Sequence, residues 1–152
     1  MNINDLFSLH GKTAIVTGGG RGLGAQIAVA FAEAGANVVV CSRNLDACQQ
    51  LSEGLKDKGV RSLALKCDVT NQNDIQHVVD ETMQEFGRID ILVNNSGTSW
   101  GAPALEMPVD KWDKVMDINL KAVFLFSQLV GKIMMEQRSG KIINIASIAG
   151  LG

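Results

Sequence analysis

Eight residues near the start of the chain, TGGGRGLG from Thr17 to Gly24, have the composition of a turn that binds phosphate. Five of the eight are glycine, the residue that loses most conformational entropy on folding. Such a cluster is expected where a ligand must approach the backbone closely. When the turn joins a strand to a helix, its backbone N–H groups and the positive end of the helix dipole point at an anion. The stretch therefore predicts a site for a phosphate or pyrophosphate group.

The glycines fit two registers of the dinucleotide-binding fingerprint. Gly20, Gly22 and Ala25 fit G-x-G-x-x-G/A. Gly18, Gly22 and Gly24 fit G-x-x-x-G-x-G. Either pattern is weak by itself and gains its specificity from its position between a strand and a helix. The alternative is a tight strand-to-helix turn that binds nothing.

The end of the second predicted strand supplies the next candidates. The stretch reads VVVCSRN, so Ser42 and Arg43 stand where an acidic residue would bind the ribose hydroxyls of NAD. The planar guanidinium of an arginine matches the oxygens of a 2′-phosphate instead. Arg21, inside the glycine turn, offers a second positive charge. The sequence therefore favours NADP over NAD, with NAD left open and two solvated arginines as the alternative.

Apolar runs that alternate with helical patterns must position these residues. The alternation is typical of βαβ units and predicts an α/β fold, a Rossmann-type doubly wound parallel sheet. Strands are predicted at residues 13–16, 37–41, 62–66, 90–94 and 141–145. Helices are predicted at residues 22–34, 45–58, 72–86 and 111–137, with a loop at 98–107. No linker interrupts the pattern, so residues 1–152 are interpreted as one dinucleotide-binding domain.

Composition and charge exclude several classes of partner. The 152 residues are 46% hydrophobic and 20% charged, which is ordinary for a globular domain. The formal net charge is -2 and no basic patch occurs, so neither nucleic acid nor a membrane surface is expected as a partner. The apolar stretch 120–135 is interrupted by Lys121, Gln128 and Lys132, which predicts an amphipathic helix and not a membrane span.

The cysteines and the first residues indicate a compartment. The three cysteines, Cys41, Cys48 and Cys67, contain no CxxC pair, so core or surface thiols are expected and metal ligands are not. The first residues lack the pattern of a signal peptide. Both features predict a reducing, cytoplasmic location.

Five ordered motifs, TGGGRGLG, CDVT, NNSG, DINLKAVF and IINIAS, resemble the short-chain dehydrogenase/reductase family. The resemblance covers the whole chain. It implies an NAD(P)-dependent oxidoreductase that acts on a small-molecule carbonyl or alcohol, and homo-oligomers for the complete protein. The stretch SGTSWGAPALEMPVDKW is similar to members that act on sugar acids such as gluconate and to reductases of 3-oxoacyl thioesters.

The resemblance also assigns cofactor contacts. Asp68 would accept from the adenine amino group beside the backbone of Val69, unless it is only an acidic residue at a helix N-terminus. Ser96 replaces the alanine that the family usually has in NNAG, and its backbone would line the nicotinamide-ribose site. The full predicted cofactor set is Thr17, Gly18, Arg21, Gly22, Leu23, Gly24, Ser42, Arg43, Asp68, Val69, Asn95, Ser96 and Gly97.

Two residues receive catalytic roles by resemblance. Asn119 matches an asparagine that holds a water in the family's proton relay; a buried asparagine that ties two backbone segments together is the alternative. Ser147 follows the fifth strand and would stabilise charge on the substrate oxygen during hydride transfer. A plain loop serine is its alternative. His10 and His77 are expected to be solvated, and Trp100 and Trp112 to be packing residues.

The family's general acid/base is absent from the sequence. In the family it is a tyrosine further along the chain, with a lysine one helical turn beyond it that lowers the tyrosine pKa. This chain has no tyrosine and ends at Gly152, five residues after Ser147. We therefore expect a chain truncated after the fifth strand, catalytically incomplete alone and marginally stable. A non-catalytic dinucleotide-binding module or sensor is the alternative, whereas NNSG and INIAS disfavour a methyltransferase.

Overall fold

Five parallel strands form one sheet in the computed structural model, which describes residues 1–150. The order across the sheet is β3-β2-β1-β4-β5. The chain runs outward from β1 to β3 and then returns to the other side of β1, which is the doubly wound topology. Residues 151–152 of the predicted domain lie outside the described part. The strands are β1 Thr13–Thr17, β2 Asn37–Ser42, β3 Ser62–Lys66, β4 Ile91–Asn94 and β5 Lys141–Asn144.

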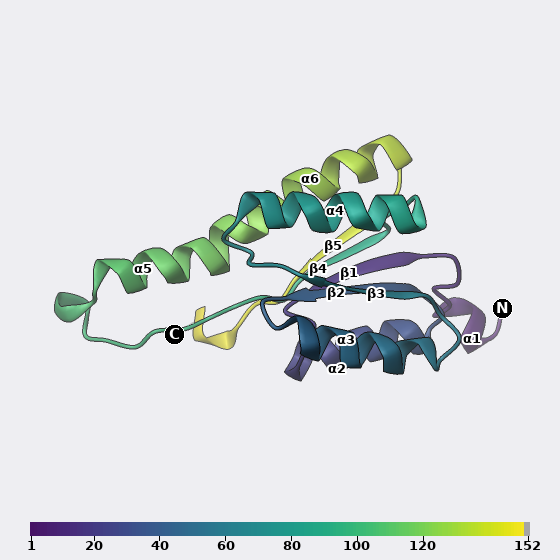
Figure 1. The fold of residues 1–152 in the computed structure, drawn as a ribbon, viewed down its shortest axis with the longest axis horizontal. Helices are drawn as coiled ribbons and strands as arrows, with labels where there is room; N and C mark the ends of the chain where they lie inside the picture. The colour runs from purple at the N-terminus through teal and green to yellow at the C-terminus, as the bar shows by residue number, and fades with distance from the viewer. Residues whose placement is uncertain (151–152) are drawn as a thin grey trace.

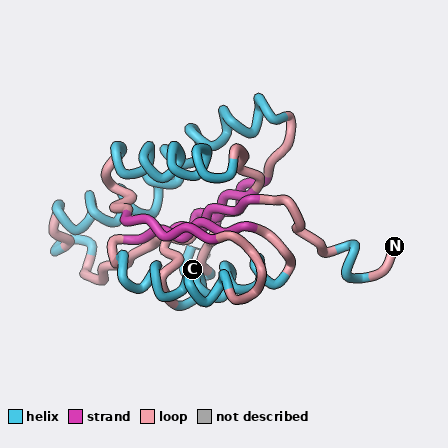
Figure 2. The backbone as a smooth tube through the Cα atoms, turned by 45° about the vertical axis from the view of Figure 1, so that its right-hand side comes forward, coloured by secondary structure: helices cyan, strands magenta, loops and turns pink. Residues whose placement is uncertain are grey.

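Helices cover both faces of the sheet (Figure 1). α2, Gly22–Glu33, and α3, Leu45–Lys56, lie on one face. α4, Gln72–Phe86, and α6, Ala122–Gln137, lie on the other, and α5, Val109–Met116, runs on into α6. The three layers are also visible in the rotated view of Figure 2. This arrangement confirms the predicted α/β fold. Three short helical pieces complete it: α1 Ile3–Leu6, and turns at Ala104–Glu106 and Ile148–Gly150.

Alternate residues of the inner strands feed two apolar cores. Ile15 and Val39 pack with α4 and α6, whereas Val16 and Val40 pack with α2 and α3. β1 and β2 therefore need apolar residues on both faces, which explains their continuous valine-rich runs. The parallel register pairs Val16 with Val40 on one side and with Val93 on the other. This register brings the carboxyl ends of β1, β2 and β4 to one edge of the sheet.

Helix ends follow the local sequence. Asn44 and Asn71 cap α3 and α4, since each side chain accepts a hydrogen bond from a backbone N–H of the first turn. Gly87 ends α4 with φ 73°, a left-handed conformation that glycine adopts without strain. The N-cap of α2 is Arg21, which makes no side-chain capping bond. The first turn of α2, which follows the glycine turn, therefore keeps its N–H groups free of a side-chain cap.

The long helix differs from its prediction. It begins at Val109, directly after Pro108, and a π-helical segment, Asp117–Lys121, separates α5 from α6. A single π-helical turn changes the spacing of the apolar residues too little for the sequence pattern to reveal it. π-helical turns are frequent at functional sites. The prediction was also too long at α3, which ends at Lys56.

The run Val109–Gln137 is long and apolar enough to cross a membrane by length and composition alone. One row of its side chains is instead packed in the core between this helix, α4 and the sheet. The row consists of Ile118, Ala122, Phe126, Val130 and Met134. The opposite side is exposed. The helix therefore has the amphipathic character that the sequence predicts.

Apolar side chains of β5 and of the α5–α6 run are open to solvent. β5 forms one edge of the sheet, and each of its four residues is exposed. A second surface, called here the apolar stripe, follows the outward side of the α5–α6 run. Its residues are Trp112, Met116, Leu120 and Phe124, each 37–60% exposed.

Candidate cofactor-binding site

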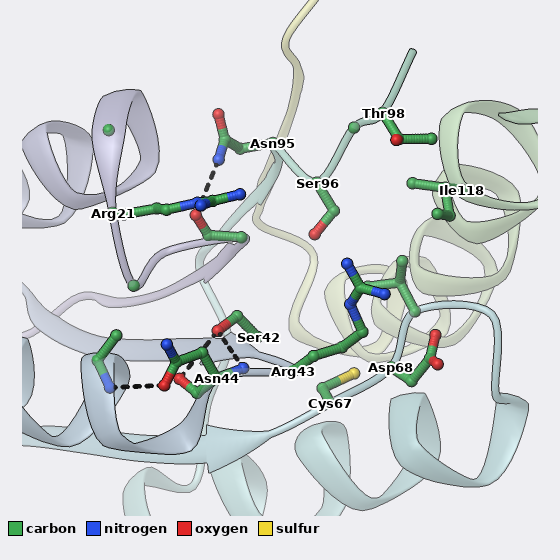
Figure 3. Close-up of a pocket in the computed structure, with 16 residues that line it drawn as sticks. Arg21, Ser42, Arg43, Asn44, Cys67, Asp68, Asn95, Ser96, Thr98 and Ile118 are labelled. Carbon is green, nitrogen blue, oxygen red and sulfur yellow. Dashed lines mark hydrogen bonds between the residues drawn. The ribbon is translucent and has the colours of Figure 1, made fainter. Parts of the chain in front are cut away.

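A cavity of about 540 Å³ opens at the carboxyl ends of β1, β2, β3 and β4 (Figure 3). This is the edge of a doubly wound sheet at which ligands bind. The cavity is lined by most of the predicted cofactor set. Of that set, Thr17 and Gly24 are buried behind it, and the side chain of Leu23 is 53% exposed. The predicted residues that line it are Gly18, Arg21, Gly22, Ser42, Arg43, Asp68, Val69, Asn95, Ser96 and Gly97.

The glycines of the turn have different tasks. Gly18 and Gly22 have φ of +62° and +56°, which other residues rarely adopt. Nothing lies within 4 Å of the position that a Cβ on Gly22 would take, so this side of the turn is open. A Cβ on Gly24 would collide with the carbonyl oxygen of Gly18 and the side-chain amide of Asn95. Gly22 thus leaves room for a ligand, whereas Gly24 allows α2 to pack closely against the turn.

Thr17 and Asn95 join the glycine turn to the segment after β4. The Thr17 hydroxyl accepts hydrogen bonds from the backbone nitrogens of Asn95 and Ser96, both at 3.0 Å. The Asn95 side-chain nitrogen donates to the carbonyl oxygens of Thr17 at 3.0 Å and Gly18 at 3.2 Å. The Asn95 amide is therefore directed at the turn (Figure 3), a scaffold role that the sequence analysis did not assign. A sign of this contact was present in the sequence, because polar residues, Thr17 and Asn95, stand at the end of the apolar strand β1 and directly after the apolar strand β4.

Two polar residues, Ser42 and Arg43, stand at the end of β2 and differ in their hydrogen bonding. The Ser42 hydroxyl donates to the carbonyl oxygen of Asn44 and accepts from its backbone nitrogen, each at 3.1 Å. These bonds shape the turn that begins α3. Arg43 is exposed and makes no hydrogen bond or ion pair with any residue in the range 1–150. Arg21 lines the same cavity and is exposed as well. The cavity mouth therefore carries two cations that are available to an anion.

Asp68 is ionised and oriented at the far end of the cavity. Its Oδ1 accepts hydrogen bonds from the Thr70 hydroxyl at 2.7 Å and the Thr70 backbone nitrogen at 2.9 Å. These bonds, and then the charges of Arg43 and Lys114, outweigh partial burial and hold the pKa of Asp68 below its ordinary value. A carboxylate held in this way can accept a hydrogen bond from an amino group. Val69, the next residue, is buried against the same wall.

The two predicted catalytic residues lie outside the cavity lining. The Asn119 side chain is paired with the backbone of Thr98: its Oδ1 accepts at 2.9 Å and its Nδ2 donates at 2.8 Å. Asn119 is exposed, so it ties two segments together without being buried. Ser147 follows β5 and is exposed, and its hydroxyl accepts from the backbone nitrogen of Ala149 at 3.2 Å.

The cysteines are free, buried thiols. A hydrogen bond with Cys67 and burial raise the pKa of Cys41 well above its ordinary value, and burial raises the pKa of Cys48. Neutral thiols of this kind are poor nucleophiles and poor metal ligands. No cluster of metal-binding side chains occurs among the described residues.

The sequence predicted solvated histidines and tryptophans that pack against other residues. His10 and His77 are exposed, as expected. The prediction that Trp100 and Trp112 are packing residues is wrong for the described part of the chain, because their side chains are 51% and 56% exposed. Trp100 lies instead under the ammonium group of Lys111, which is 4.7 Å from the ring centroid. Trp100 lies in the loop between β4 and α5, whereas Trp112 lies on the exposed side of α5.

The sheet order and the glycine turn at its carboxyl edge place the chain in the class of doubly wound α/β proteins. The family model for short chain dehydrogenases matches residues 12–152, and the chain belongs to that family. Members of this family bind NAD(P), which agrees with the position of the cavity at the glycine turn.

Three relatives illustrate the similarity. Sorbose reductase from Candida albicans is 38% identical over 151 residues, which cover 98% of this chain and 54% of that protein. The 5-keto-D-gluconate 5-reductase of Escherichia coli is 36% identical over 146 residues, 96% of this chain and 58% of that protein. A 7α-hydroxysteroid dehydrogenase solved with NADH has a TM-score of 0.95 at 36% identity and covers all of this chain and 59% of that one. The chain thus spans little more than half the length of the curated relatives that it matches.

Proposed function

We propose that this chain is the cofactor-binding part of an NADP-preferring short-chain oxidoreductase, which transfers a hydride between NADP(H) and a small carbonyl or alcohol substrate. The observation that carries the proposal is Arg43, an exposed cation just after β2 that lines the cavity and makes no hydrogen bond or ion pair with any of residues 1–150. An acidic side chain at this place would favour NAD instead. Arg21 adds a second cation on the same rim.

Different walls of the cavity bind different parts of the dinucleotide in this proposal. The open turn at Gly22 and the uncapped start of α2 offer N–H groups to the diphosphate. Asp68 and Val69 hold the adenine, while residues 95–97 line the nicotinamide-ribose side. Arg43 binds the 2′-phosphate through charge-assisted hydrogen bonds. Residues 1–152 act as one domain in this proposal.

Hydride transfer to a carbonyl also needs a general acid/base, which is a tyrosine in the family that the chain resembles. When bound, the nicotinamide supplies the hydride chemistry. The Ser147 hydroxyl stabilises charge on the substrate oxygen. Asn119, whose side chain is oriented by its two hydrogen bonds with the Thr98 backbone, holds a water of the proton relay. The chain has no tyrosine, so we propose that it is catalytically incomplete by itself and has at most trace reductase activity. A binding module without activity is the second candidate, favoured by the same lack of tyrosine.

The substrate of the complete protein is proposed to be a sugar or sugar acid. Relatives named for sorbose and for 5-keto-D-gluconate support this class. A 3-oxoacyl thioester is the alternative that the loop sequence also favours. The three free buried thiols support a cytoplasmic location. The apolar stripe supports assembly into a homo-oligomer.

A fluorescence titration tests the cofactor assignment. NADPH should bind the 152-residue chain at least about tenfold more tightly than NADH, and Arg43→Gln should remove most of that ratio. Lys132→Gln, at an exposed site on α6, is the matched control and should leave the ratio unchanged. Equal or tighter binding of NADH to the wild-type chain would overturn the preference for NADP.

A further inference from the structure

Ser96 departs from the pattern that the family resemblance implies, where a small apolar residue stands. Its backbone is fixed, because its N–H donates to the Thr17 hydroxyl at 3.0 Å. This bond places Ser96 directly after β4, on the wall of the cavity that faces the glycine turn. The backbone position of Ser96 is therefore fixed, and its side chain differs from that of alanine only in the hydroxyl group.

The hydroxyl lies against the first glycine of the turn. A Cβ built on Gly18 would come within 3.2 Å of the Ser96 Oγ, so this oxygen packs on the face of Gly18 that lacks a side chain. Figure 3 shows the oxygen directed toward the open centre of the pocket. Within residues 1–150 the Ser96 hydroxyl makes no hydrogen bond, and the residue is half-buried. A hydroxyl is both a donor and an acceptor, so this group has unused capacity that faces the cavity.

The other serine of the cavity behaves differently. The Ser42 hydroxyl is engaged twice by Asn44 and shapes the turn after β2. Among the described residues the Ser96 hydroxyl has no such bonds, so removing its oxygen breaks no hydrogen bond within residues 1–150. Its position beside Gly18 puts it next to the glycine turn, where the diphosphate is proposed to bind.

We propose that the Ser96 hydroxyl is an additional affinity-determining contact, which hydrogen-bonds the ribose–diphosphate backbone of the bound dinucleotide. This inference rests on the proposed function. Hydrogen bonds to charged oxygens are stronger than neutral ones, so one such contact has a measurable effect on affinity. Because NADH and NADPH share this backbone, the contact strengthens both equally and does not discriminate between them.

The test compares Ser96→Ala with Ser99→Ala, a neighbouring exposed serine that does not line the cavity. Ser96→Ala should weaken NADPH and NADH by the same factor, about threefold to tenfold, and leave their ratio unchanged. Its melting temperature should equal that of the wild type, because no internal bond is lost. Ser99→Ala should change neither affinity.

Other results would overturn either this inference alone or the proposed function with it. Unchanged affinity in Ser96→Ala, with wild-type binding intact, overturns this inference and leaves the proposed function standing. A loss confined to NADPH, or an affinity loss accompanied by a lower melting temperature, also overturns it, because the hydroxyl would then serve the 2′-phosphate or the fold. A wild-type chain that binds neither dinucleotide overturns the proposed function itself, and the inference with it.

Discussion

Asn95 and Thr17, which are 78 residues apart in the sequence, are joined by two hydrogen bonds of 3.0 Å. One runs from the Asn95 backbone nitrogen to the Thr17 hydroxyl, the other from the Asn95 side-chain nitrogen to the Thr17 carbonyl oxygen. These bonds tie the end of β1 to the segment after β4. The glycine turn begins at this junction, so hydrogen bonds within the chain hold this wall of the cavity.

Thr17→Val should destabilise the fold. The change keeps the side-chain shape and leaves the backbone nitrogens of Asn95 and Ser96 without their acceptor, so we expect a loss of about 1–3 kcal/mol in the free energy of unfolding. Thr13→Val in the same strand is the matched control, because the Thr13 hydroxyl is buried with no hydrogen-bond partner among the described residues. Urea unfolding measures both; equal effects in the two variants would refute the role given to Thr17.

Gly24→Ala should disturb the turn and its ligand together. The added methyl group would meet the Gly18 carbonyl oxygen and the Asn95 amide, so the turn must shift, at about 1–3 kcal/mol. NADPH affinity should fall in parallel. Gly54→Ala in α3 has open space around it and should stabilise the chain by up to about 1 kcal/mol, since alanine favours helices. Thermal melts and titrations that show the two variants alike would count against the close packing at Gly24.

Acidification should weaken the edge of the sheet opposite the cavity through Asp90. Burial alone would raise the pKa of this carboxyl, but Arg88, which donates at 2.7 and 2.6 Å, the Thr13 backbone nitrogen and Lys12 outweigh burial and lower it. The unfolded chain, with an ordinary aspartate pKa of about 3.9, then binds a proton at a higher pH than the folded chain does. The stabilisation is therefore complete above about pH 4 and is lost as the pH falls further toward the lowered pKa.

Asp90→Asn provides the comparison for this pH dependence. Its stability should be lower than that of the wild type at neutral pH, and it should decline less steeply on acidification. Denaturant unfolding at a series of pH values measures both slopes. A variant that loses stability with falling pH as steeply as the wild type does would show that Asp90 is not the group responsible.

The apolar stripe should hold copies of the chain together. A Leu120→Glu, Phe124→Glu double variant places two charges on it and should lower the mass measured by light scattering to that of a single chain. Gln128→Glu, exposed on the same helix, is the control and should keep the wild-type mass. A wild-type chain that is a monomer with a cooperative, high-temperature circular dichroism melt would contradict both this assembly and the expected marginal stability.

The sequence predicted the sheet well because its signals are local. Valine-rich runs, helix periods and the asparagine caps at Asn44 and Asn71 act over a few residues, and every predicted strand is present within one residue of its predicted bounds. The glycine turn and the β2 tip were found for the same reason.

What the sequence did not show depends on contacts between distant segments. The Thr17–Asn95 junction and the Gly24 packing against Gly18 form only when separate elements meet. For Asn119 the sequence offered a tie between two backbone segments as an alternative, but it could not identify Thr98 as the partner. The π-helical segment and the exposure of Trp100 are likewise set by tertiary structure. Periodicity carries no information on such contacts.

Nuclear magnetic resonance of the ¹⁵N-labelled chain during an NADP⁺ titration tests the central claim most directly, because it locates the ligand residue by residue. We predict saturable shifts of the backbone amides of residues 18–24, 43 and 95–97, and unchanged signals for Lys12 and Arg88 at the opposite edge of the sheet. Signals from the glycine turn that stay in place at saturating NADP⁺, or that change less than those of the opposite edge, would contradict the assignment of this cavity as the cofactor site.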